Sequence, residues 1–300
     1  MTAARPLSPA LAFAVAAAGI GLFSIMDAFM KALTLAIGVY NALFWRALLA
    51  ALIGGTLWYA GGGRRPSPRA LRLHLARGAI TTAMALLFFW GLARVPMAQA
   101  IALTYIAPLL ALLLGALLLH ERVGARVVLA SLAALAGVGV ILAGHARLAL
   151  GPDGLQGAAA ILVSAVLYAG NLVVARLQSQ VADAREIAFV QSAVLAALLA
   201  LAAPWLATVP PMAHWWQIAV AAALATGSLF LLGWAYAHGE TGFLATTEYT
   251  SFVYAALLGW AVFGERVAPT TLAGAAVIVA ACLYGARRRA VPRGALEGAA

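Results

Sequence analysis

The chain alternates between long apolar runs and short polar gaps. A helix that crosses the hydrocarbon of a bilayer needs about 20 apolar residues, and ten runs approach that length. The predicted spans are Ala10–Met30, Val39–Tyr59, Leu75–Ala93, Met97–Leu118, Arg126–Ala143, Leu155–Val174, Ile187–Leu206, Trp215–Tyr236, Gly242–Phe263 and Thr270–Gly285. The gaps leave no room for a soluble domain, and Pro68–His74 reads as a short basic interfacial helix. The pattern therefore predicts an all-α integral membrane protein with ten transmembrane helices.

The composition supports this prediction. Hydrophobic residues make up 65% of the 300 residues, and charged residues make up 9%. A soluble fold of this size cannot hide so much apolar surface from water, so the lipid bilayer is the expected surrounding. The single cysteine, Cys282, excludes an internal disulfide and a cysteine cluster for metal.

The positive charges predict the orientation. The formal net charge is +10, but the arginines sit in short gaps between apolar runs, which argues against a nucleic-acid partner. With ten spans both termini share one side, which carries fourteen positive residues against four on the other. Lys31 is among those four, in the gap after the first span. Because positive residues favour the cytoplasm, we expect a multi-pass protein of the bacterial inner (plasma) membrane with both termini cytoplasmic.

An internal repeat divides the chain. A shift of 144 positions places Tyr105 on Tyr249 and Glu121-Arg122-Val123 on Glu265-Arg266-Val267. The predicted units are 1–149 and 150–300, the second with a basic cytoplasmic tail. Each has five spans, an odd number, so the second enters the membrane from the opposite side. Inverted repeats are typical of carriers with a substrate site near the midplane, whereas duplication for packing alone is the plainer alternative.

Glu248 is the most prominent candidate functional residue, because it lies roughly 10 Å along the ninth predicted span. A carboxylate at that depth should face the bundle interior or a watery cavity. We expect it to bind a substrate ammonium or to exchange a proton. Alternatively, it is a structural partner for Asn171 or Arg176.

Asp27 and Arg46 form a second candidate constellation. Both should lie at similar depth in the outer leaflet, where an ion pair would offset the burial of either charge. They are either an outer gate that separates when the carrier opens or a permanent structural pair. The corresponding positions in the second half are Asn171 and, with one residue of slippage, Gln191.

A mid-span proline and several aromatic residues complete the candidates. Pro108 removes one backbone donor and frees the carbonyl of Thr104, which predicts either a hinge or a static kink. Aromatic side chains within spans either line a cavity and stack on a planar or apolar substrate or serve packing. The predicted substrate-binding set is Trp90, Tyr105, Tyr168, Asn171, Glu248 and Tyr249, and the predicted gating or hinge set is Asp27, Arg46 and Pro108.

The sequence carries no pattern for catalysis or for a cofactor. The histidines have no metal-ligand partners at useful spacing, and no phosphate loop or nucleophile elbow is present. These absences argue against an enzyme and against ATP-driven transport, and we expect no cofactor and no metal.

Three segments resemble a known family: Gly91–Ala100, then Tyr105–Leu109, then Glu121-Arg122. They look like EamA domains of the drug/metabolite transporter superfamily. The second half repeats them more loosely, with Phe252 at the position of Pro108. The resemblance implies two EamA-like units that surround a central path for a small-molecule substrate.

Within that superfamily the chain also resembles, in overall impression and without a diagnostic motif, the aromatic amino acid exporters. This resemblance implies a secondary transporter that exports aromatic or other amphipathic amino acids by alternating access, alone or coupled to protons. A drug or nucleotide-related metabolite exporter is the alternative, and an intramembrane enzyme or a scaffold without transport is a further one.

Overall fold

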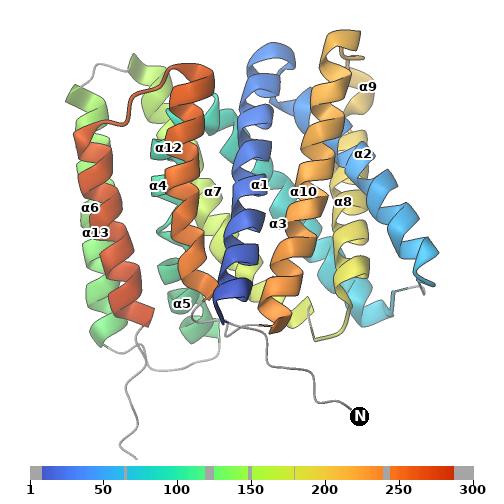
Figure 1. Cartoon of the computed structure of the whole chain (residues 1–300), viewed down its shortest axis with the longest axis horizontal. Helices are drawn as coiled ribbons and strands as arrows, with labels where there is room; N and C mark the ends of the chain where they lie inside the picture. The colour runs from blue at the N-terminus through green and yellow to red at the C-terminus, as the bar shows by residue number, and fades with distance from the viewer. Residues whose placement is uncertain are drawn as a thin grey trace, which may run out of the picture.

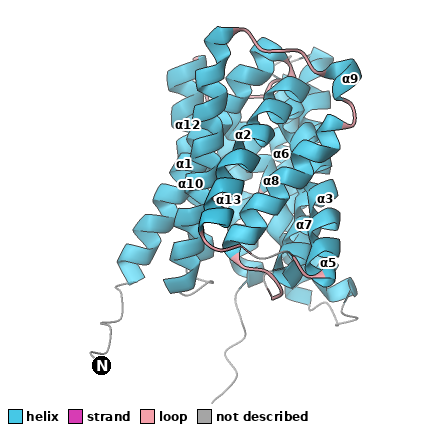
Figure 2. Cartoon of the chain, turned by 90° about the vertical axis from the view of Figure 1, so that its right-hand side faces the viewer, coloured by secondary structure: helices cyan, strands magenta, loops and turns pink. Residues whose placement is uncertain are grey.

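The computed structural model describes residues 9–63, 66–118, 125–147, 151–178, 180–238 and 244–286. Within these ranges the regular structure is helical, without a strand (Figure 2). The helices are α1 (Pro9–Ile37), α2 (Val39–Ala60), α3 (Pro68–Leu92), α4 (Met97–Thr104), α5 (Ala107–Leu118), α6 (Ala125–Arg147), α7 (Gly151–Gln178), α8 (Ala184–Ala200), α9 (Ala203–Leu206), α10 (Met212–His238), the 3-10 turn η1 (Ala245–Tyr249), α12 (Thr250–Phe263) and α13 (Pro269–Ala286).

Five helices are long and apolar enough to cross a membrane: α1, α2, α3, α7 and α10. Shorter apolar helices lie at Met97–Ala111, Val128–Gly144, Glu186–Ala200 and Pro269–Tyr284. The helices run roughly side by side along one direction (Figure 1). We call the end where α1 begins and α13 ends the lower end, and the end that carries the α12–α13 turn the upper end.

Two details of the predicted pattern are wrong. The first span was expected to end at Met30, but α1 continues to Ile37, so Lys31 lies inside a helix and not in a gap. The basic segment Pro68–His74 is not a separate interfacial helix but the first turns of α3. Ser67 sets that start, because its side chain accepts a hydrogen bond from the Ala70 N–H at 3.2 Å.

The two halves of the chain interleave. The main packing partner of α1 is α10, that of α2 is α8, that of α3 is α7, and that of α6 is α13. In each pair one helix precedes residue 148 and the other follows residue 150. One large apolar core therefore draws on both halves.

Close helix approach explains one of these pairs. At the crossing of α6 and α13, a Cβ added to Gly274 would lie 2.6 Å from the Gly137 carbonyl oxygen and 2.4 Å from Ile141 Cγ1. A Cβ added to Gly137 would lie 2.8 Å from the Gly274 carbonyl oxygen. Small residues let helix backbones meet in this way inside a membrane.

We predict that Gly274→Ala destabilises the bundle by about 1–3 kcal/mol, because overpacking pushes α13 away from α6. The measurement is the midpoint of thermal unfolding in detergent. Gly139→Ala is the matched control, since Gly139 lies on the same α6 and its Cβ would meet nothing within 4 Å. Equal stability of the two variants would show that this close approach contributes nothing.

Candidate functional site

The helix that carries Pro108 is broken. Helix α4 ends at Thr104 and α5 begins at Ala107, with a turn at Tyr105 and Ile106 between them. Proline causes such a break because its ring crowds the carbonyl of the fourth residue before it and it donates no hydrogen bond. The thiol of Cys282 points at the Tyr105 carbonyl oxygen at 3.2 Å and supplies a donor at this break. The expected kink is present, while its use as a hinge stays a prediction.

At the repeat position of the first break the helix changes from 3-10 to α-helical turns while the backbone stays helical, and we call this change the second break. The 3-10 turn η1 ends at Tyr249, 144 residues after Tyr105, and α12 begins at Thr250. This position has no proline, since Phe252 stands where Pro108 stands in the first half. Its support comes from another helix.

The Tyr105 hydroxyl supplies that support. It accepts a hydrogen bond from the Phe252 N–H at 2.9 Å and lies 2.8 Å from Ser251 Oγ and 3.2 Å from the Tyr249 carbonyl oxygen. The two tyrosine rings meet edge to face with centroids 5.3 Å apart. Tyr105 is 6% exposed, so its hydroxyl is occupied by the backbone of α12. Only its ring remains for the predicted substrate contact.

Glu248 sits beside this contact, in η1, and is half-buried. Its carbonyl accepts a hydrogen bond from Ser251 Oγ at 2.6 Å. Within the described ranges its carboxylate forms neither of the ion pairs, while its charge acts on the two tyrosines. Asn171, the proposed structural partner, is bonded elsewhere, and the Arg176 side chain lies outside what the structure describes.

Asn171 belongs to a chain of polar side chains near the lower end. Its Oδ1 accepts a hydrogen bond from Arg77 Nε at 3.0 Å, and Arg77 also donates to Gln178. Gln178 contacts His74 Nδ1, and His74 Nε2 lies 2.8 Å from Glu186 Oε1. We call Glu186, His74, Gln178, Arg77 and Asn171 the lower polar network. It joins α3 to α7 and α8.

Sequence reasoning missed most of this network. It placed His74 at the end of a basic interfacial helix, whereas His74 and Gln178 are 0% exposed in the structure. His74 and Arg77 lie about one turn apart on α3, and that spacing is the signal which could have indicated a common face. The pairing of α3 with α7 and α8 is not visible in the sequence.

Asp27 and Arg46 are neighbours without a close contact. Both are half-buried, and their opposite charges attract. Neither of the ion pairs in the described part of the chain involves them. The Nε of Arg46 is buried without a hydrogen-bond partner, and the guanidinium carbon lies 5.9 Å from the centroid of the Phe89 ring. Their role in gating remains a prediction.

The other aromatic candidates are spread along the bundle. Trp90 lies in the last turn of α3, where the Arg94 guanidinium covers its ring at 3.6 Å. Tyr168 is half-buried on α7 and lies close enough to Arg77 for an electrostatic interaction. The structure therefore brings Tyr105, Glu248 and Tyr249 together and places the other predicted substrate residues elsewhere.

An ionic cluster occupies the upper end. Lys31 forms an ion pair with Glu265 and donates a hydrogen bond to the Val95 carbonyl at 2.8 Å. The other carboxylate oxygen of Glu265 accepts a hydrogen bond from the Met97 N–H at 2.7 Å. From the sequence, Glu265 was identified only as a repeat position and Lys31 only as a positive charge on the outer side. That Lys31 is the single lysine of the sequence was an available signal.

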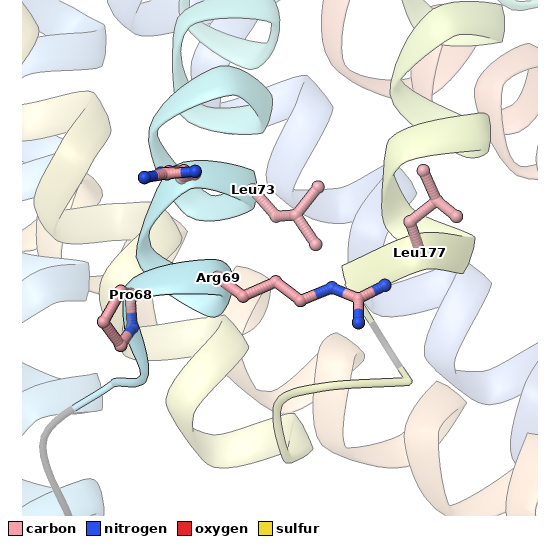
Figure 3. Close-up of a pocket in the computed structure, with 5 residues that line it drawn as sticks. Pro68, Arg69, Leu73 and Leu177 are labelled. Atoms are coloured by element: carbon pink, nitrogen blue, oxygen red, sulfur yellow. The ribbon is translucent and has the colours of Figure 1, made fainter.

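An open pocket of about 580 Å³ lies at the lower end between α3 and α7 (Figure 3). Pro68, Arg69, Arg72 and Leu73 line it from α3, and Leu177 lines it from α7. The Arg69 side chain extends across it towards Leu177. Two exposed arginines at this end agree with a position at lipid headgroups.

Comparison with known proteins identifies the family. The sequence matches the EamA-like transporter family over residues 9–143 and again over 155–284. The pseudopaline exporter CntI from two strains of Pseudomonas aeruginosa is 28% identical over 270 residues, which cover 89% of this chain and 93% of that protein. A solved crystal structure, 23% identical, shares the fold with a TM-score of 0.59 over 93% of this chain and 98% of the other. The chain is therefore a membrane protein of the EamA-like transporter family, and a transporter rather than an enzyme.

Proposed function

We propose that this protein exports a small metabolite across the inner membrane by alternating access, with aromatic or other amphipathic amino acids as the substrate class. The observation that carries the proposal is the contact between two broken helices at Tyr105 and Tyr249. Irregular backbone at membrane depth is tolerated where it is buried in protein or lines a cavity. In carriers, discontinuous helices form substrate sites between repeats.

The proposed topology has ten spans in two inverted five-helix repeats. The described helices support it, because α1 begins and α13 ends at the same, lower end (Figure 1). That end also carries the exposed Arg69 and Arg72. We therefore propose that the lower end is cytoplasmic and that export runs from the lower to the upper end.

The proposed amino acid specificity rests on the groups at the breaks. The Glu248 carboxylate is the natural partner for an ammonium group. The half-buried ring of Tyr249, which packs edge to face on the buried ring of Tyr105, offers apolar surface to a side chain. The relative named a pseudopaline exporter supports export of a small molecule without selecting amino acids. A drug or nucleotide-related metabolite exporter remains the second candidate.

The first functional prediction concerns Glu248. We expect Glu248→Gln to lower export of the accepted substrate about tenfold or more, because the neutral amide pairs poorly with an ammonium group. Stability should hold, since the volume is kept and the carboxylate makes no ion pair with a described residue. The measurement is transport of a panel of labelled metabolites by proteoliposomes, with and without a pH gradient.

Asp153→Asn is the matched control, because Asp153 is an exposed carboxylate in the first turn of α7. Loss of pH dependence with preserved exchange in Glu248→Gln would assign the carboxylate to proton coupling. Transport, pH dependence and thermal stability that all match the unsubstituted protein would remove every role proposed here for Glu248.

The second functional prediction concerns topology. Reporter fusions after Arg147 and after the carboxyl terminus should report opposite compartments, with the terminal fusion in the cytoplasm. The reason is that five spans separate the two points in the proposed arrangement. If both fusions report the same compartment, the repeats are not inverted.

A further inference from the structure

The cluster at the upper end ties three separate segments together. Lys31 comes from α1, Val95 and Met97 from the α3–α4 turn and the start of α4, and Glu265 from the α12–α13 turn. The first two segments belong to the first half of the chain, and the third belongs to the second half. Any movement that separates the halves at this end must break the ion pair.

The turn that follows α12 positions the Glu265 carboxylate close to Lys31 and Met97. Helix α12 ends at Gly264 in the left-handed conformation, with φ 66°, which favours glycine. The Glu265 N–H then donates to the Gly259 carbonyl at 2.9 Å, so the chain folds back over the last turn of α12. A Cβ on Gly259 would lie 2.6 Å from Glu265 Oε2, so a side chain there would push the end of the carboxylate away from this position.

The cluster is nearly closed to the surroundings. The Lys31 side chain is 6% exposed and that of Glu265 is 17% exposed. The Phe263 ring covers the ammonium, with its centroid 5.2 Å from Nζ. When one partner of a buried ion pair is removed, the remaining charge is strongly destabilised. The pair therefore favours two arrangements, one intact and buried and one separated and hydrated.

Its position links it to the broken helices. Met97 is the first residue of α4 and lies about 12 Å along the helix from Tyr105, at 1.5 Å per residue. Glu265 follows α12 after the single residue Gly264, and α12 begins at the second break. The cluster thus fastens the upper ends of both broken helices above the contact of Tyr105 with Tyr249.

We propose that Lys31 and Glu265 are the outer latch of the transport cycle, which holds the upper end shut and separates when the path opens there. This inference rests on the proposed alternating access. The residues act as positioning residues, because they set which end is open and are not assigned contact with the substrate. The pair predicted for this role, Asp27 and Arg46, has no ion pair to break in this structure.

The test uses Lys31 as its own probe, because no other lysine is present. The full chain in lipid nanodiscs is acylated with a small N-hydroxysuccinimide acetate and, separately, with a bulky sulfonated biotin ester. The peptide with Lys31 is quantified by mass spectrometry, which separates it from the terminal amine. The ratio of bulky to small reaction rates measures access and corrects for any change in the reactivity of the amine.

We expect a low ratio in the unsubstituted protein and a rise of about tenfold or more in Glu265→Gln, which weakens a buried pair. Gly259→Ala should raise the ratio too, because it displaces the carboxylate without removing a charge, and it carries the test alone if Glu265→Gln fails to fold. The matched controls, Asp153→Asn and Gly233→Ala, should match the unsubstituted protein. A Cβ on Gly233 would meet nothing within 4 Å.

An unchanged ratio in Glu265→Gln and Gly259→Ala, or a high ratio in the unsubstituted protein, overturns the proposed latch. The assay needs no substrate, so its outcome is separate from that of the transport assay. If the ratio is unchanged in the variants but the protein transports substrate, only the proposed latch is rejected. A raised ratio in a protein that transports none of the panel keeps the latch as a conformational contact and removes the proposed function.

Discussion

Every helix of the first half has its main packing partner in the second half, and the rest of the structure depends on this constraint. Among the described residues the large apolar core draws on both halves, so the two cannot part as separate bodies without exposing packed helix faces. The polar contacts follow the same division, since Lys31 bonds Glu265, Arg77 bonds Asn171, and the Tyr105 hydroxyl bonds the start of α12.

The contacts at the two breaks supply hydrogen-bond partners that lipid cannot supply. A backbone group without a partner is expensive away from water, so a helix break inside a bundle requires a donor or acceptor from elsewhere. Cys282 and the Tyr105 hydroxyl fill that role at the two breaks. The halves match in backbone but differ in chemistry. Thr104 donates to its own helix at the Ile101 carbonyl at 2.7 Å, whereas its repeat partner Glu248 brings a carboxylate to the second break. This asymmetry supports the proposed role of Glu248 in substrate recognition.

Local patterns predicted local features well. Apolar run length located the helices, and Pro108 predicted the first break because its effect acts within one turn. Lys31 was placed in a gap because hydropathy, too, considers only the local sequence. Hydropathy treats a charge as the end of a span, whereas this charge is neutralised by Glu265, which lies 234 residues away. The second break and the lower polar network were likewise out of reach, since each depends on a side chain from another helix. Tyr105 was identified as a repeat position, but its hydrogen bonds required the structure.

The central claim is that the two ends open in turn. It is tested most directly by electron–electron spin-label distances at both ends, with Cys282→Ser removing the native thiol. Labels at Leu35→Cys and Arg266→Cys report the upper end, and labels at Arg72→Cys and Gln180→Cys report the lower end. All four positions are exposed. The account predicts that Glu265→Gln lengthens the upper distance while the lower distance shortens or stays unchanged. Upper and lower distances that lengthen together, or that both stay fixed, would contradict it.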